Sequence, residues 1–180
     1  MNISSVASLD KLAKEIVQVR ITEKPKGTKR VVREDTKEFL EVGVGKKSDV
    51  TQRTFIPFVR SIIQNAKREK IKKIALDAMD FRFDHMSAVT DEELGSLIAQ
   101  NMLMANYEFT VYKAKPKDGF REVSEVLIAN SSKEMQAGVK KGIAIGEEVN
   151  ACRTLANTPG GDMTPQGLAK AAKMAVAGLP

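Results

Sequence analysis

The side chains that most often carry out nucleophilic or metal chemistry are scarce in this 180-residue sequence. It contains a single histidine, His85, and a single cysteine, Cys152. Zinc sites built from four cysteines, or from two cysteines and two histidines, are therefore impossible within the chain. Cys152 falls on the apolar side of a long predicted helix, and its only cationic neighbour is Arg153. We expect a buried cysteine that contributes to packing.

One cluster combines carboxylates with the histidine: Asp77, Asp80, Asp84 and His85. Its first two members follow a predicted strand, where α/β proteins often place function, and such carboxylates could bind a divalent ion. The spacing matches no defined ligand pattern, and apolar side chains alternate with the acids. We expect a solvated, structural role, and we predict no catalytic and no metal-binding residue.

A glycine turn offers a second kind of chemistry. Gly43-Val44-Gly45 follows a predicted strand, and its backbone amides could approach a phosphate. The dinucleotide fingerprint would need another glycine where Ser48 stands, so a turn that ends the strand is the favoured interpretation. Lys46 and Lys47 keep phosphate binding open.

Basic residues give the chain a formal charge of +6 and gather in two segments. Segment 20–33 contains one acid, Glu23, and segment 67–73 contains one acid, Glu69. Such clusters could contact a phosphate backbone, although solvated surface is the alternative and no aromatic platform for stacking bases is interleaved. The candidate anion or nucleic-acid contacts are Lys24, Lys26, Lys29, Arg30, Lys46, Lys47, Lys67 and Arg68.

The elements that must position these residues alternate between strand-like and helix-like segments, which is typical of an α/β domain. Strands are predicted over 16–21, 30–33 (an edge strand), 39–44, 71–78 and 123–128, with an extended segment over 107–112. Apolar periodicity predicts a helix over 55–66, with Pro57 in its first turn. Further helices are predicted after a capping box at Thr90 and Glu93, after one at Ser131 and Glu134, and after Thr164-Pro165.

Three glycines repeat at four-residue intervals on the long helix that begins near Ser131: Gly138, Gly142 and Gly146. Lys140, Lys141, Glu147 and Glu148 on the same helix exclude burial in lipid. We therefore expect this helix to approach a sheet or a neighbouring helix closely.

The composition is that of a soluble globular protein, with 42% hydrophobic and 29% charged residues. No apolar run approaches the ~18–20 residues of a membrane-spanning helix, and the first residues do not have the pattern of a signal peptide. We expect a cytoplasmic protein with no membrane partner. A lone cysteine also excludes an internal disulfide framework.

Residues 153–159, Arg-Thr-Leu-Ala-Asn-Thr-Pro, are followed by Thr164-Pro165. This pattern resembles the junction between the N-terminal and catalytic domains of the cytosol (leucyl) aminopeptidases. There, a helix ends in Ala-Arg-Asp-Leu-x-Asn-x-Pro and Thr-Pro opens the next helix. The matching residues are Arg153, Leu155, Asn157, Pro159, Thr164 and Pro165, whereas Cys152 and Thr154 replace the usual alanine and aspartate.

Two earlier segments also resemble that family. Residues 42–47 are similar to its strand ending in Gly-x-Gly-Lys, and residues 106–113 are similar to its Tyr-x-Phe-x-x-Tyr-Lys segment. The resemblance implies an α/β, macro-domain-like fold: a mixed sheet flanked by helices on both faces. It also implies a parent enzyme that removes N-terminal residues, often leucine, from peptides with two divalent ions, zinc or manganese, and forms a homohexamer.

The family holds its metals around an Asn-Thr-Asp-Ala-Glu-Gly-Arg signature in the catalytic domain, which this sequence lacks. We therefore expect 1–157 to be an N-terminal accessory domain and 158–180 to start the interdomain linker. Its partner would be its own catalytic domain, its role assembly or substrate access, and it would need no cofactor of its own. By itself we expect it to be inactive, and a monomer or weak dimer.

A function of a different class also fits the sequence. The macro-like fold, the glycine turn and the basic clusters would suit a binding module for an ADP-ribose-like ligand or for DNA.

Overall fold

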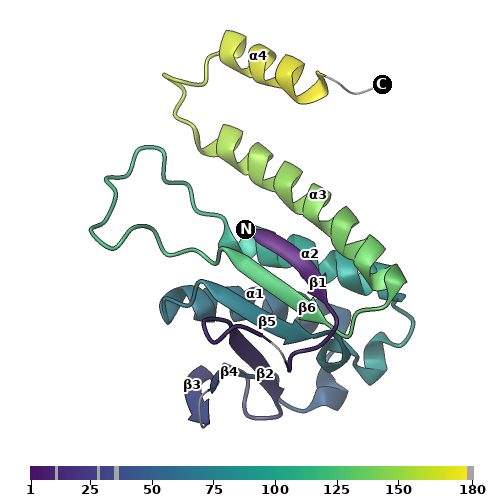
Figure 1. The fold of residues 1–180 in the computed structure, drawn as a ribbon. Helices are drawn as coiled ribbons and strands as arrows, with labels where there is room; N and C mark the ends of the chain where they lie inside the picture. Colours follow the sequence, from purple (N-terminus) through teal and green to yellow (C-terminus); the bar gives the residue numbers. More distant parts are fainter. Residues whose placement is uncertain (11, 28, 35–36, 178–180) are drawn as a thin grey trace.

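The computed structural model describes residues 1–10, 12–27, 29–34 and 37–177. Within these residues, six strands form one sheet in the order β1-β6-β5-β2-β4-β3 (Figure 1). Every neighbouring pair is parallel except β3 with β4, which makes the sheet mixed. The strands are β1 (Asn2–Val6), β2 (Val17–Thr22), β3 (Lys29–Glu34), β4 (Lys37–Gly43), β5 (Lys73–Asp77) and β6 (Glu125–Ala129). The α/β class, the mixed sheet and the edge position of β3 are confirmed, and β1 is an additional strand that we did not predict.

Four α-helices accompany the sheet in the described residues: α1 (Gln52–Arg68), α2 (Asp91–Asn106), α3 (Lys133–Asn157) and α4 (Pro165–Val176). The predicted capping box of α2 is present, and Thr164 caps α4 with Pro165 in its first turn. Two details were wrong. The cap of α3 is Ser132, whose Oγ accepts from the Met135 N–H, and Pro57 lies in the second turn of α1, because Thr51 starts that helix earlier than the apolar pattern indicates.

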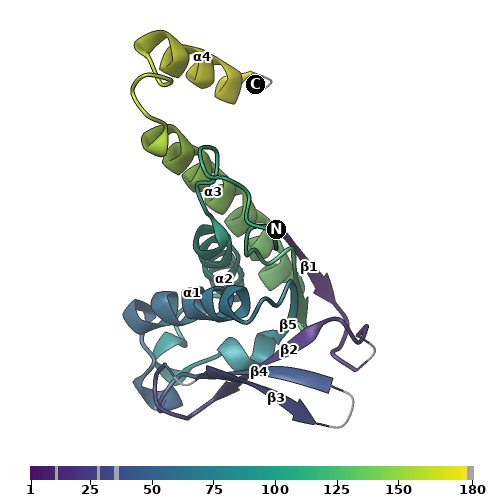
Figure 2. The same cartoon turned by 90° about the vertical axis from the view of Figure 1, so that its left-hand side faces the viewer.

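Helices α1 and α2 cover the same face of the sheet (Figure 2). The crossovers β4-α1-β5 and β5-α2-β6 both step toward β1, and right-handed crossovers in one direction place their helices on one side. The core lies between these helices and the sheet. Phe55 and Ile62 of α1 and Ile98 of α2 are almost fully buried there, together with Leu40 and Ile128 of the strands.

The opposite face of the sheet has a different cover. The connection from β1 to β2 crosses the sheet in the other direction, and the Gln18 side chain of β2 donates to the Leu9 carbonyl at 3.1 Å. No helix lies in the described part of that connection. The expected helical cover on both faces is therefore not found in the described residues, because the connection that crosses the second face is an irregular segment.

Helix α3 runs beside α2 in the same direction, and glycines permit the contact. A Cβ at Gly138 would lie 1.9 Å from the Glu92 carbonyl oxygen, and one at Gly142 would lie 2.4 Å from the Ser96 carbonyl oxygen. A larger residue could not occupy either position without moving α3 away. The close approach predicted from the glycine spacing is confirmed.

Beyond Gly146, helix α3 follows the end of α2, where Asn150 and Arg153 donate to the Leu103 and Met104 carbonyls, and then projects from the body of the domain, with α4 further out (Figure 1). Cys152 lies in this projecting part and is exposed, so its predicted burial was wrong. None of the residues of α4 is buried.

The remaining described elements are three 3-10 turns, η1 (Lys47–Asp49), η2 (Ala78–Phe81) and η3 (Asp84–Met86). Residues 107–112, predicted as extended, form a loop without a strand. No helix in the described part of the chain is long and apolar enough to cross a bilayer.

Candidate functional site

Two glycine turns form one wall of a pocket at the carboxyl ends of β2 and β4, the edge where open parallel sheets usually bind ligands. Gly27 and Gly45 have φ angles of +88° and +80°, which glycine adopts without strain. Two backbone hydrogen bonds join the turns: the Val44 N–H donates to the Thr22 carbonyl at 2.9 Å, and the Gly45 N–H to the Lys24 carbonyl at 2.9 Å. This wall is therefore held by the backbone.

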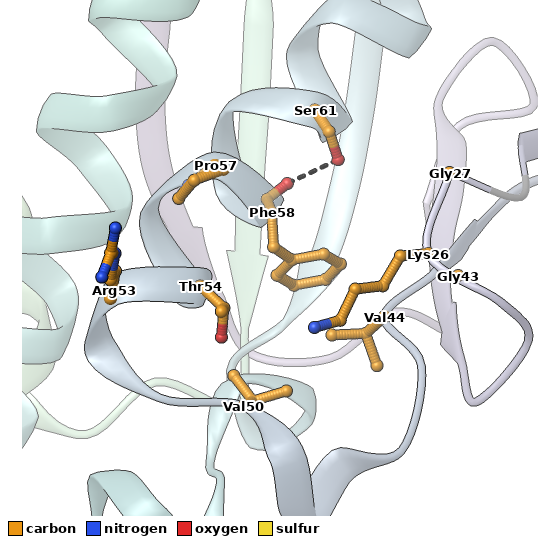
Figure 3. Close-up of a pocket in the computed structure, with 10 residues that line it drawn as sticks. All are labelled: Lys26, Gly27, Gly43, Val44, Val50, Arg53, Thr54, Pro57, Phe58 and Ser61. Carbon is orange, nitrogen blue, oxygen red and sulfur yellow. Dashed lines mark hydrogen bonds between the residues drawn. The ribbon is translucent and has the colours of Figure 1, made fainter.

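Helix α1 forms the other wall (Figure 3). The volume of the pocket is about 370 Å³. The Phe58 ring lies at the centre, with Val44, Val50 and Pro57 as further apolar surface. The Ser61 hydroxyl lines the pocket but donates to the Phe58 carbonyl at 2.7 Å, within its own helix. The interior is mainly apolar.

The charged residues that line this pocket are both cations, Lys26 and Arg53. In Figure 3 the Lys26 ammonium points into the pocket beside Val44 and the Phe58 ring, whereas the Arg53 side chain points away. Lys26 is an exposed residue, and among the described residues the pocket lining offers its ammonium no carboxylate. The pocket thus combines an apolar interior with an ammonium group that has no carboxylate beside it in the pocket lining.

Two other candidate anion contacts are already paired with a carboxylate. Lys24 Nζ and Arg30 Nε each lie 2.6 Å from the same Oε2 of Glu41, whose side chain is 7% exposed. Hydrogen bonds from Arg30 and Lys24 lower the pKa of Glu41 to about 2. These two cations therefore neutralise a buried acid, and a phosphate backbone would have to compete with it.

The second basic segment is also occupied. Lys67 Nζ donates to the Asn106 carbonyl at 3.2 Å and lies 3.8 Å from Glu108, while Arg68 contacts Glu69 at 3.4 Å and Asn65 at 3.4 Å. The other candidates are dispersed. Lys46 and Lys47 are exposed just after the glycine turn, and the side chain of Lys29 lies outside the described residues. The described candidates thus do not form one continuous cationic band.

Asp77 of the acidic cluster makes structural contacts. Asp77 accepts from the Met79 N–H at 2.9 Å with one oxygen and from Asn130 Nδ2 at 2.8 Å with the other. Burial, and then the nearby Asp77 charge, raise the pKa of Asp80. In the described part of the chain, no three histidine, cysteine or acidic side chains converge as metal ligands would. These residues do not supply the donor set of a divalent ion.

The junction residues meet a loop that is distant in sequence. The Arg153 guanidinium lies 4.1 Å from the centre of the Tyr107 ring and donates to the Met104 carbonyl at 2.8 Å. The Tyr107 hydroxyl lies 3.2 Å from Thr154 Oγ1 and 3.4 Å from Asn157 Nδ2. Tyr107 thus fastens the projecting end of α3 to the loop after α2.

A second tyrosine holds the turn after α3. The Tyr112 hydroxyl donates to Asp162, and this contact raises the pKa of Tyr112. The Asp162 and Met163 N–H groups both donate to the Pro159 carbonyl, at 2.9 and 2.8 Å, and Thr164 Oγ1 accepts from the Gly167 N–H at 3.2 Å. Leu155 is half-buried on α3. The sequence segments around 107–112 and 153–165 therefore form one junction in space.

The sequence profile of the cytosol aminopeptidase family, N-terminal domain, matches residues 7–116. The chain belongs to the cytosol aminopeptidase family. It is 30% identical over 132 residues to a probable cytosol aminopeptidase of Aquifex aeolicus (strain VF5), covering 73% of this chain and 25% of that protein. It is also 30% identical over 141 residues to one of Roseiflexus castenholzii (strain DSM 13941 / HLO8), covering 74% of this chain and 27% of that protein. The chain spans about a quarter of the length of these curated relatives.

Two solved structures share the fold of this chain. A mutant of tomato leucine aminopeptidase superposes with a TM-score of 0.72 at 17% identity, covering 98% of this chain and 42% of that one. The bottromycin maturation enzyme BotP in complex with Mn gives 0.67 at 21% identity, covering 92% of this chain and 36% of that one. The first superposition includes nearly the whole chain, so the similarity of fold extends beyond the profile match.

Several residues around the family's glycine turn were missed by sequence reasoning. Gly43, Val44 and Lys26 were singled out, whereas Pro57 and Phe58 were interpreted only as parts of a helix and Val50 was not considered. Their apolar spacing predicts burial against the sheet, and it cannot show that the first turns of α1 leave a space beside Lys26. The one available signal was the proximity in sequence of the glycine turn to the start of this helix.

Proposed function

We propose that this chain is the non-catalytic N-terminal domain of a metal-dependent aminopeptidase that removes N-terminal residues, often leucine, from peptides. Its role in the parent protein is assembly or substrate access, in the cytoplasm, and its partner is the parent's own catalytic domain. Family membership supports the activity of the parent, and the manganese named for BotP supports a parent that uses a divalent metal. We propose two such ions, zinc or manganese.

The observation that carries this proposal is the fastened junction between α3 and the loop after α2. Arg153 and Tyr107 join two elements through a stacked cation and a hydroxyl contact with Thr154. Such a contact fixes the direction in which α3 leaves the domain, which is what a domain must do to hold a neighbour at a defined angle.

Helix α4 supports the same interpretation. Leu168, Met174 and Val176 are 51, 68 and 61% exposed. Clusters of exposed apolar side chains mark surfaces that other protein covers. In this proposal the catalytic domain covers them, and residues 158–180 begin the connection to it, while 1–157 form the accessory domain.

The test compares the chain with its full-length parent. Purified 1–180 is assayed with leucine p-nitroanilide and manganese, and we expect no turnover, because the described residues contain no group of metal ligands. The full-length protein under the same conditions is expected to be active and hexameric by light scattering, whereas 1–180 is expected to be a monomer or weak dimer. Turnover by 1–180, or a concentration-independent hexamer of 1–180, would contradict the proposal.

A second candidate function is a binding module for an ADP-ribose-like ligand or for DNA, and the pocket of Figure 3 favours a small ligand. Four of the proposed nucleic-acid contacts are engaged with other protein groups, namely Lys24, Arg30, Lys67 and Arg68. Calorimetry with ADP-ribose tests the ligand. A salt-dependent mobility shift of duplex DNA would instead favour nucleic acid.

A further inference from the structure

We propose that the pocket between the two glycine turns and α1 binds a small molecule with a flat apolar body and a single carboxylate, an arylalkyl carboxylate. The carboxylate would pair with Lys26, and the apolar body would pack on Phe58. This inference goes beyond the second candidate function, because it assigns a different class of ligand to the same pocket, and it does not depend on the peptidase role of the parent.

Size and lining favour a small molecule. A volume of about 370 Å³ is at the low end of ligand pockets, which span roughly 300–1,000 Å³. The walls are the Phe58 ring, Val44, Val50 and Pro57, and they have few polar groups to offer. A ligand rich in hydroxyl groups would lose hydrogen bonds to water on entry, whereas an aromatic or aliphatic body would not.

The positive charge at the pocket favours a ligand whose polar end is a carboxylate. Lys26 and Arg53 line the pocket, no carboxylate does so among the described residues, and the Lys26 ammonium is directed inward (Figure 3). A carboxylate near this ammonium gains a charge-assisted hydrogen bond. A ligand ammonium in the same place would meet a like charge, so a free amine is disfavoured.

The stem of Lys26 packs against one of the two glycine turns, although the residue as a whole is exposed. Its side chain lies against Gly45, where a Cβ would come within 3.3 Å of Lys26 Cε. Gly45 therefore leaves the space through which the lysine stem passes, and the hydrogen bond from its N–H to Lys24 ties the two turns together. A lysine stem held against a fixed turn loses less freedom when its ammonium binds an anion.

The experiment uses three probes with the same phenylbutyl body: phenylbutyrate, phenylbutanol and phenylbutylamine. Binding to the purified chain is followed by amide chemical shifts and calorimetry. We expect phenylbutyrate to bind at least about tenfold more tightly than the amine, since a charge-assisted hydrogen bond contributes this much. The shifts should change at Gly43, Val44 and Thr54.

Matched variants locate the site. Lys26→Met removes the ammonium but keeps an apolar stem of similar length, and Lys46→Met removes an exposed lysine that does not line the pocket. We expect about tenfold weaker phenylbutyrate binding for Lys26→Met and no change for Lys46→Met. Ser61→Phe should block the pocket, and thermal unfolding monitored by circular dichroism shows whether each variant is folded.

Three results would overturn the proposal: no phenylbutyrate binding at millimolar concentration, equal binding of the acid and the amine, or equal effects of the two lysine variants. ADP-ribose in the same titration separates this proposal from the broader one. Binding of ADP-ribose without phenylbutyrate would refute the ligand class proposed here and retain a binding module. Binding of phenylbutyrate without ADP-ribose would support the proposal.

Discussion

Replacement of Glu41 by glutamine tests how much the fold depends on the most buried ionic group among the described residues. Glu41 points from β4 to the face of the sheet opposite α1, where one of its oxygens accepts from both Arg30 and Lys24 at 2.6 Å. The side chain of Glu41 is 7% exposed. The amide of glutamine keeps the shape but loses the charge, so two cations remain beside a neutral group.

The magnitude follows from the pKa of Glu41, which falls from 4.5 to about 2 in the folded chain. A shift of that size corresponds to at most about 3 kcal/mol of stability at neutral pH. Lys24 and Arg30 are themselves 40 and 58% exposed, so water screens both contacts. We therefore expect Glu41→Gln to lower the free energy of unfolding by about 1–2 kcal/mol at neutral pH.

The direction of the pKa shift of Glu41 determines how its contribution to stability changes with pH. Because folding lowers the pKa of Glu41, its contribution is present above the unfolded value of 4.5 and is lost as the pH falls toward about 2. Urea unfolding followed by circular dichroism should show a large difference between wild type and Glu41→Gln at neutral pH, and a smaller one at about pH 3.

The control is Glu38→Gln. Glu38 pairs with Arg33 at 2.6 Å on the same pair of strands, but its side chain is 38% exposed and that of Arg33 is 81% exposed. This change should cost about 0.5 kcal/mol or less. Equal costs for the two variants, or a cost of Glu41→Gln that does not vary with pH, would refute the reasoning.

Three further predictions concern α3. Gly142→Ala should destabilise the fold by about 1–3 kcal/mol in urea unfolding, because its Cβ would lie 2.4 Å from a backbone oxygen of α2, whereas Gly160→Ala, with no atom within 4 Å, should have little effect. Tyr107→Leu should loosen the junction and speed proteolysis of the turn at 158–163 without a large change in melting temperature, and unchanged cleavage would contradict this. Cys152 is exposed and should react with a thiol reagent in the native chain; reaction only after unfolding would show that the projection of α3 is wrong.

Local patterns were sufficient to predict most elements of the fold. The capping box at Thr90 and the apolar periodicity of α1 and α2 depend on neighbours within one or two turns; α2 begins where expected, and α1 begins about one turn earlier than expected. Strand β1 lacked such a signal, because Asn2–Val6 contains two serines and one core side chain, Ile3, and is stabilised by pairing with the distant β6. The cover of the second face of the sheet also could not be predicted, because nothing in the sequence of the connection at 7–16 shows which face it crosses.

The basic clusters show why a site is harder to predict than an element. In the sequence, Lys24, Lys26 and Arg30 are neighbours with hardly any opposing charge nearby. In the fold, Glu41 lies within reach of two of them although it is 17 and 11 residues away, because β4 stands beside both β2 and β3. Lys26 follows the same turn but points to the other side, into an apolar pocket. A count of charges along the chain cannot distinguish Lys24 from Lys26. In the folded sheet, Lys24 lies beside Glu41, whereas Lys26 lines an apolar pocket. Among the described residues that line this pocket, no carboxylate accompanies Lys26, so an anionic ligand gains a charge-assisted hydrogen bond there.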